Sequence, residues 1–191
     1  MSFLAEYWFW IVMGGFALVA AITLLMNWQK KKLRAFLPLF DNQEGSASVF
    51  FRATISGLVK GQPASIAFIP RDRYSPPRRL VTMACVQPNA WKITPRGPMN
   101  VELTFTPKVK TNDPLWDEKF VVRSKSPEAI LYLTGDQKKK EAVELLMQEP
   151  QVKSLEAKGG KLKLFQWHKS MNDSTVPELQ NILEWMGRFS Y

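Results

Sequence analysis

The organisation of this chain follows from one stretch near its start, YWFWIVMGGFALVAAITLLM at residues 7–26. The stretch has no charged residue, and only Thr23 is polar. At about 1.5 Å per residue, a helix of this length covers roughly 30 Å, the thickness of the hydrocarbon core of a bilayer. Aromatic residues, which favour the headgroup level, mark both ends: Tyr7, Trp8 and Trp10 at one, Trp28 at the other. The stretch therefore predicts a transmembrane helix rather than a buried core helix.

The residues on either side of this helix indicate an uncleaved anchor and its orientation. A signal peptide needs basic residues before its apolar part and small residues at a cleavage site, whereas Glu6 precedes this stretch and no Ala-x-Ala follows it. Four basic residues come directly after it: Lys30, Lys31, Lys32 and Arg34. The positive-inside rule predicts a single-pass protein with its N-terminus outside and its C-terminal domain in the cytoplasm. We expect the basic cluster to lie at the membrane surface, near anionic headgroups.

We divide the chain into an anchor at residues 1–35 and one soluble domain at residues 36–191. With 46 % apolar, 12 % aromatic and 23 % charged residues, the composition is that of a folded protein and not of a disordered one. About 155 residues are enough to bury a core without disulfides. Cys85 is the only cysteine, which excludes an intrachain disulfide and fits a reducing compartment.

The first part of the domain reads as strands and the second part mostly as helices. Alternating or continuous apolar patterns predict strands at residues 48–55, 64–69, 80–86, 90–94, 101–106 and 119–123. Helices are predicted from Ser126, from Gln137 to Gln148 and from Pro177 to Phe189, with a hairpin around Gly159 and Gly160. Segregated strands and helices favour an α+β fold with a mostly antiparallel sheet and about three helices.

The sequence offers little for catalysis. A Cys–His nucleophile would have to pair Cys85 with His168, the only histidine, but Cys85 lies in an apolar run where a thiol is usually inert. An acid–base pair could come from three carboxylates around Trp116, in a loop expected before the strand at 119–123: Asp113, Asp117 and Glu118. No set of residues has zinc-ligand spacing and no phosphate-binding glycine motif occurs, so we expect no metal and no cofactor.

The most suggestive cluster surrounds the turn PRDRYSPP at residues 70–77: Arg71, Arg73, Tyr74, Arg78 and Arg79. Guanidinium groups match the geometry of phosphates and carboxylates, so this turn could bind an anionic ligand, a lipid headgroup or an acidic protein partner. The alternative is a solvated loop that keeps the domain soluble. Nucleic-acid binding is not expected, because no helix-turn-helix or RNP-like signature accompanies the charge.

These observations predict a membrane-tethered cytoplasmic interaction domain without catalytic activity, which holds a protein partner or an anionic ligand near the bilayer. One alternative is a membrane-anchored hydrolase or transferase. The other is a domain that binds anionic lipids or phosphate ligands through the arginine-rich turn.

Overall fold

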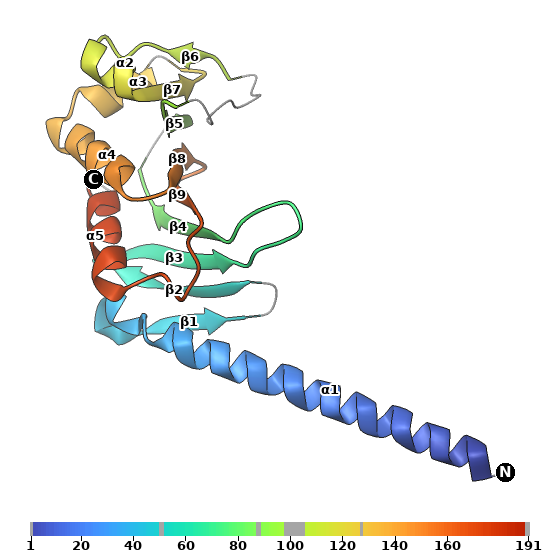
Figure 1. Ribbon diagram of the computed structural model, residues 1–191. Coiled ribbons are helices and arrows are strands. Elements are labelled where there is room, and N and C mark those ends of the chain that lie inside the picture. The colour runs from blue at the N-terminus through green and yellow to red at the C-terminus, as the bar shows by residue number, and fades with distance from the viewer. Residues whose placement is uncertain (1, 50–51, 87–88, 98–105, 127, 190–191) are drawn as a thin grey trace.

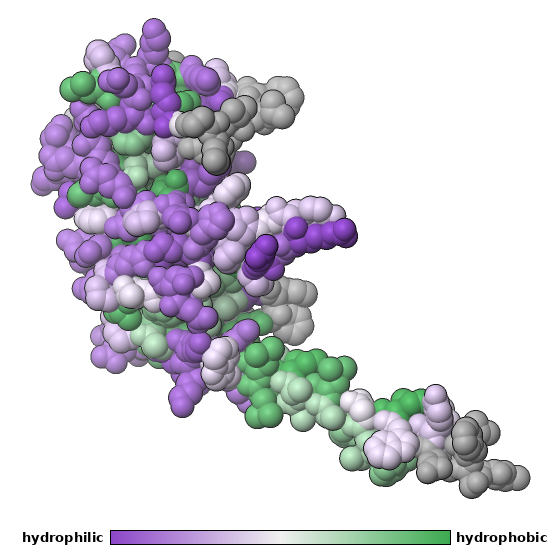
Figure 2. Space-filling model, in the orientation of Figure 1, coloured by the Kyte–Doolittle hydropathy of each residue, from purple (hydrophilic) through white to green (hydrophobic). Residues whose placement is uncertain are grey.

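The computed structural model describes residues 2–49, 52–86, 89–97, 106–126 and 128–189 (Figure 1). Helix α1, Ser2–Arg34, leaves the rest of the molecule as a single long rod. Its apolar residues form the green extension in Figure 2, and its apolar window makes no buried contact with the domain. By length and composition, α1 can cross a membrane.

The domain is built on one nine-stranded sheet with the order β1-β2-β3-β4-β9-β8-β5-β7-β6. Neighbouring strands are antiparallel throughout the described residues. The strands are β1 (Gly45–Ser48), β2 (Ala53–Val59), β3 (Gln62–Ile69), β4 (Arg78–Ala84), β5 (Trp91–Pro95), β6 (Lys108–Val109), β7 (Phe120–Ser124), β8 (Val152–Lys158) and β9 (Lys161–Trp167). The hairpin β8–β9 is inserted between β4 and β5, so the centre of the sheet joins distant parts of the sequence.

The helices cover one face of this sheet. They are α2 (Pro114–Lys119), α3 (Glu128–Thr134), α4 (Gln137–Gln148) and α5 (Val176–Gly187), with single 3-10 turns at Leu37–Leu39 (η1) and Asp41–Gln43 (η2). Burial alternates along β4, where Val81 and Met83 face the helices and Leu80 and Thr82 are only half-buried. The core therefore lies between the sheet and the helices, and the opposite face of the sheet has no helical layer among the described residues.

Helix α1 enters the domain without a linker. Leu33, in its last turn, is fully buried, and Met26 packs partly against the same core. The ring of Phe36 lies 5.6 Å from that of Phe68 on β3. Lys32 donates a hydrogen bond of 2.9 Å to Oδ1 of Asn172 in the loop before α5. These contacts fix α1 to the domain.

A second contact holds the chain that follows α1 against the sheet. The Asp41 carboxylate accepts hydrogen bonds from the backbone amides of Lys60 and Gly61, at 2.9 and 2.7 Å, in the β2–β3 turn. These amides lower the pKa of Asp41, with Gly61 contributing most. Glycine is required at position 57, because a Cβ there would come within 2.7 Å of the Phe40 ring.

The structure confirms an N-terminal apolar helix and a mostly antiparallel sheet with several helices. Helix α4 has the predicted bounds, and the hairpin turns at Gly159 and Gly160, both with positive φ. Two predictions differ. Residues 113–118, expected to be a loop, contain α2, because Asp113 caps it and Pro114 occupies its first turn. The strand expected at residues 48–55 is divided between β1 and β2; residues 50–51, and most of the strand expected at 101–106, lie outside the described residues.

Candidate functional site

The arginine-rich turn at residues 70–77 joins β3 to β4 and projects to the side on which α1 leaves the domain (Figure 1). It forms a hydrophilic protrusion in Figure 2. Arg71, Arg73 and Tyr74 are exposed, and Tyr74 keeps 87 % of its surface in solvent. The Arg73 guanidinium carbon lies 5.7 Å from the centroid of the Tyr74 ring. Neither Arg71 nor Arg73 has a carboxylate partner among the described residues.

One acidic residue organises this turn. The Asp72 carboxylate accepts a hydrogen bond of 2.8 Å from the Tyr74 amide and one of 3.0 Å from Arg78. The Tyr74 amide is the main cause of a lowered pKa at Asp72. Arg78 is therefore neutralised locally. A shallow hollow of about 380 Å³ lies along the turn and also contacts His168.

Arg79 does not belong to this exposed group. Its side chain is fully buried and points to the helical layer. It donates two hydrogen bonds to Gln166, of 2.9 and 2.7 Å, and one of 2.7 Å to Ser174. It also forms an ion pair of 2.7 Å with Glu178. Lys169 donates to the same carboxylate at 2.9 Å. Burial acts to raise the pKa of Glu178, but the hydrogen bonds from Arg79 and Lys169 outweigh it and lower the pKa. Arg79 thus links β4, β9 and α5.

The sheet register separates the two residues of the nucleophile hypothesis. Strands β4 and β9 pair Arg78 with Trp167 at one end and Ala84 with Lys161 at the other. Cys85 follows the second end, and His168 follows the first. Seven residues of strand separate them by roughly 20 Å, so they cannot act as a thiolate and its base. Burial raises the pKa of the Cys85 thiol, which also disfavours a nucleophile.

The carboxylates proposed for acid–base chemistry have structural partners. Asp113 accepts from the amides of Leu115 and Trp116 at 3.1 and 3.2 Å and is paired with Lys140. The hydrogen bond from Lys140 is the main cause of its lowered pKa. Asp117 accepts from the amide and hydroxyl of Thr111, at 3.0 and 2.9 Å.

The side chain of Glu118, the third of these carboxylates, is exposed. Among the described residues, no group of three His, Cys, Asp or Glu side chains could hold a metal ion.

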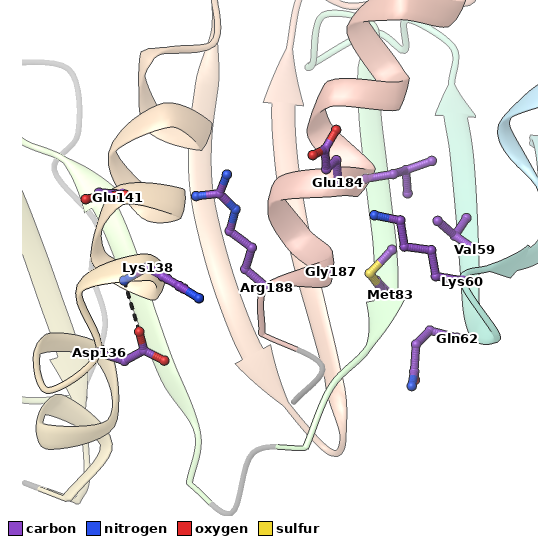
Figure 3. Close-up of a pocket in the computed structure, with 11 residues that line it drawn as sticks. Val59, Lys60, Gln62, Met83, Asp136, Lys138, Glu141, Glu184, Gly187 and Arg188 are labelled. Atoms are coloured by element: carbon purple, nitrogen blue, oxygen red, sulfur yellow. Dashed lines mark hydrogen bonds between the residues drawn. The ribbon is translucent and has the colours of Figure 1, made fainter.

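A cavity of about 630 Å³ lies on the helical side between the β2–β3 turn, the first turn of α4 and the end of α5 (Figure 3). Sequence patterns gave no signal for it, because its walls come from separate elements. Its floor is apolar, and its rim carries charged side chains of both signs: Lys60, Lys138 and Arg188, with Asp136, Glu141 and Glu184. Equal numbers of cations and carboxylates give it no preference for either charge.

The uncovered face of the sheet has a second, cationic hollow of about 370 Å³. Lys92 and Lys163 flank Glu156 in register across β5, β8 and β9. Two aromatic side chains of β9, Phe165 and Trp167, also line this hollow. Sequence reasoning missed this surface, since it depends on the insertion of the β8–β9 hairpin.

The basic cluster after the apolar stretch lies where α1 meets the domain. Lys31 and Arg34 are exposed, whereas Lys30 and Lys32 are half-buried. The Lys32 ammonium lies 3.8 Å from the centroid of the Trp28 ring. Lys31 and Arg34 thus present their charges to solvent, whereas Lys32 is engaged within the protein.

Comparison with known proteins gives no relative. No protein-family model, no curated protein and no solved structure matches this chain.

Proposed function

We propose that this protein is a membrane-tethered binding protein without catalytic activity, whose C-terminal domain holds a protein partner or an anionic ligand beside the bilayer. The observation that carries the proposal is the continuity of α1. Its apolar part is exposed, and its last turn is buried in the domain core at Leu33. An exposed apolar helix of this length is stable in lipid and not in water. The domain would therefore sit directly on the membrane surface.

We further propose that the N-terminus lies outside and the domain in the cytoplasm. Lys31 and Arg34 remain exposed at the domain end of α1, and Glu6 precedes the apolar stretch. Basic residues close to a span resist translocation more than acidic ones do. This asymmetry supports a cytoplasmic domain.

The binding surface that we assign to this function is the exposed part of the arginine-rich turn, Arg71, Arg73 and Tyr74. Two guanidinium groups without carboxylate partners and an exposed aromatic ring suit a carboxylate- or phosphate-bearing partner. Because the turn projects on the side of α1 (Figure 1), such a partner would be held close to the bilayer.

Membrane fractionation and protease protection test the tether and its orientation. The intact chain should stay in the pellet after alkaline carbonate washing and be released by detergent. Protease added to intact cells should leave the domain uncut, and permeabilisation should expose it. Recovery in the supernatant without detergent contradicts the tether, and cleavage in intact cells contradicts the orientation.

Cross-linking before solubilisation tests the binding surface. The wild-type chain should recover partners that the double variant R71Q/R73Q loses. The variant R96Q is the matched control, since Arg96 is also exposed but lies after β5, away from the turn. Equal recovery by all three proteins contradicts the assigned surface. Turnover by the purified chain, with no partner recovered, would favour the hydrolase or transferase alternative.

The phosphate-ligand alternative uses the same two arginines. It is favoured by the hollow along the turn, whose only carboxylate, Asp72, is already bonded to Arg78. In that case inorganic pyrophosphate should raise the melting temperature of the detergent-solubilised chain. The increase should disappear in R71Q/R73Q and persist in R96Q.

A further inference from the structure

A groove of about 370 Å³ lies at the junction between α1 and the domain. It meets the arginine-rich turn only at the two ends of that turn, Pro70 and Pro77, and the arginines of the turn do not line it. Its walls come from the end of α1, the start of β2, the end of β3 and the loop before α5. The residues that line it are Trp28, Gln29, Val49, Arg52, Ala53, Phe68, Ile69, Pro70, Pro77, Ser170, Met171 and Asn172.

The lining of this groove is amphipathic. Most of it is apolar, and the polar side chains are Gln29, Ser170 and Asn172. Arg52 is its only charged residue, and no carboxylate lines the groove. The Arg52 side chain is exposed and has no partner among the described residues. The groove therefore offers one guanidinium beside an apolar wall.

A second cation, Lys32, lies beside the groove and is held by two uncharged groups of the protein. Lys32 donates a hydrogen bond of 2.9 Å to Asn172. Its ammonium also lies 3.8 Å from the centroid of the Trp28 ring. The Trp28 ring and the Asn172 oxygen, which could otherwise recognise a ligand ammonium, are thus already engaged with Lys32.

The position of the groove along α1 determines what can reach it. The apolar stretch ends at Met26, so Trp28 and Gln29 fall at the headgroup level if α1 crosses the bilayer. The strand ends that form the opposite wall lie on the α1 side of the domain (Figure 1). An amphiphile from the bilayer would therefore meet this groove directly.

We infer that this groove binds one anionic phospholipid of the bilayer, with its phosphate at Arg52 and its glycerol and upper acyl region against Trp28 and Met171. The inference rests on the proposed membrane tether and extends it to a specific lipid. A guanidinium binds phosphate oxygens in a bidentate manner. Anionic lipid is favoured over a zwitterionic one, because no carboxylate in the groove would bind a headgroup ammonium.

Lipid retention by the full chain in neutral detergent tests this inference. Native mass spectrometry would compare phosphatidylglycerol with phosphatidylcholine of the same acyl chains. The wild-type chain should retain phosphatidylglycerol preferentially. R52Q should lower its apparent affinity roughly tenfold, as expected for loss of a charge-assisted hydrogen bond. R96Q removes an exposed arginine elsewhere and should leave retention unchanged.

A second variant, N172D, keeps an oxygen acceptor for Lys32 and adds a negative charge to the groove. It should weaken phosphatidylglycerol retention without unfolding the chain. Equal retention of the two lipids, or equal retention by wild type, R52Q and N172D, overturns the inference. Displacement of the lipid by millimolar inorganic phosphate would also overturn it, by identifying the occupant as free phosphate. None of these outcomes would contradict the proposed membrane tether, because that proposal is contradicted only if the chain is released from membranes without detergent.

Discussion

At the scale of single residues, two neighbours in one strand have opposite surroundings. Arg78 bonds Asp72 at the surface, whereas Arg79 is buried with Gln166 and Glu178. Side chains alternate between the two faces of a strand, so one of two consecutive arginines had to face the core. Both arginines could be assigned to a basic cluster from the sequence. Which of them is buried could not be predicted, because that depends on how β4 pairs with its neighbouring strands.

We predict that R79A lowers the free energy of unfolding by about 3–5 kcal/mol, because Glu178 and Gln166 would stay buried without their partner. R73A should change it by less than about 0.5 kcal/mol, as expected for an exposed side chain. Urea unfolding of the detergent-solubilised chain, followed by circular dichroism, measures both. A similar small effect for the two variants would contradict a structural role for Arg79.

Glu178 makes this network sensitive to acid. Its pKa is lowered from the usual 4.5 by Arg79 and Lys169 against the opposing effect of burial. A carboxyl group whose pKa is lower in the folded than in the unfolded protein stabilises the fold. This stabilisation is fully present above the pKa of the unfolded state, and it is lost as the pH falls through the pKa of the folded state. Glu149 acts in the opposite direction, because burial, followed by the charge of Glu178, raises its pKa.

We therefore expect the stability difference between wild type and E178Q to be largest near neutral pH and to shrink as the pH falls below 4.5, the usual carboxyl pKa. Urea unfolding at a series of pH values from 7 to 3 measures it. Because the charge of Glu178 also raises the pKa of Glu149, both proteins should carry E149Q, so that the comparison isolates Glu178. A difference that does not depend on pH would show that the ion pair contributes nothing.

At the scale of elements, the sequence patterns predicted features that depend on neighbouring residues, such as where a helix begins and ends. Helix α4 has its predicted bounds because Asp136 caps its start and Pro150 follows its end. The order of the sheet could not be predicted, since the insertion of β8–β9 between β4 and β5 depends on pairing between distant strands. The groove beside α1 and the cavity of about 630 Å³ were missed for the same reason. Their walls meet only after that pairing.

Helix α1 gives a prediction at this scale. The hydroxyl of Thr23, within the apolar stretch, donates a hydrogen bond of 2.8 Å to the carbonyl of Val19, and the stretch has no charged side chain. V19D should disfavour membrane insertion by about 3 kcal/mol. The matched control is L131D, at an exposed leucine of α3. Carbonate extraction should release V19D and retain L131D; retention of both would contradict a spanning helix.

At the scale of the whole molecule, the anchor and the domain share one core. The boundary expected at residue 35 assigns Leu33 to the anchor, but Leu33 is fully buried with the domain and Met26 packs partly against it. The end of α1 thus belongs to the domain core, directly after an apolar stretch that is long enough to cross a membrane. Hydropathy located the apolar stretch, but it could not show that the last turn of the same helix is buried in the domain, because that depends on contacts with distant strands.

This arrangement predicts how the domain behaves without its anchor. A fragment of residues 36–191 lacks Leu33 and should be less stable than a fragment of residues 27–191, by about 2–5 kcal/mol for the loss of one buried leucine. The longer fragment with L33A should behave like the shorter one, which separates the leucine's contribution from that of chain length. Urea unfolding measures all three fragments. Equal stability of the two wild-type fragments would mean that α1 and the domain fold independently and that the junction does not fix the domain on the membrane.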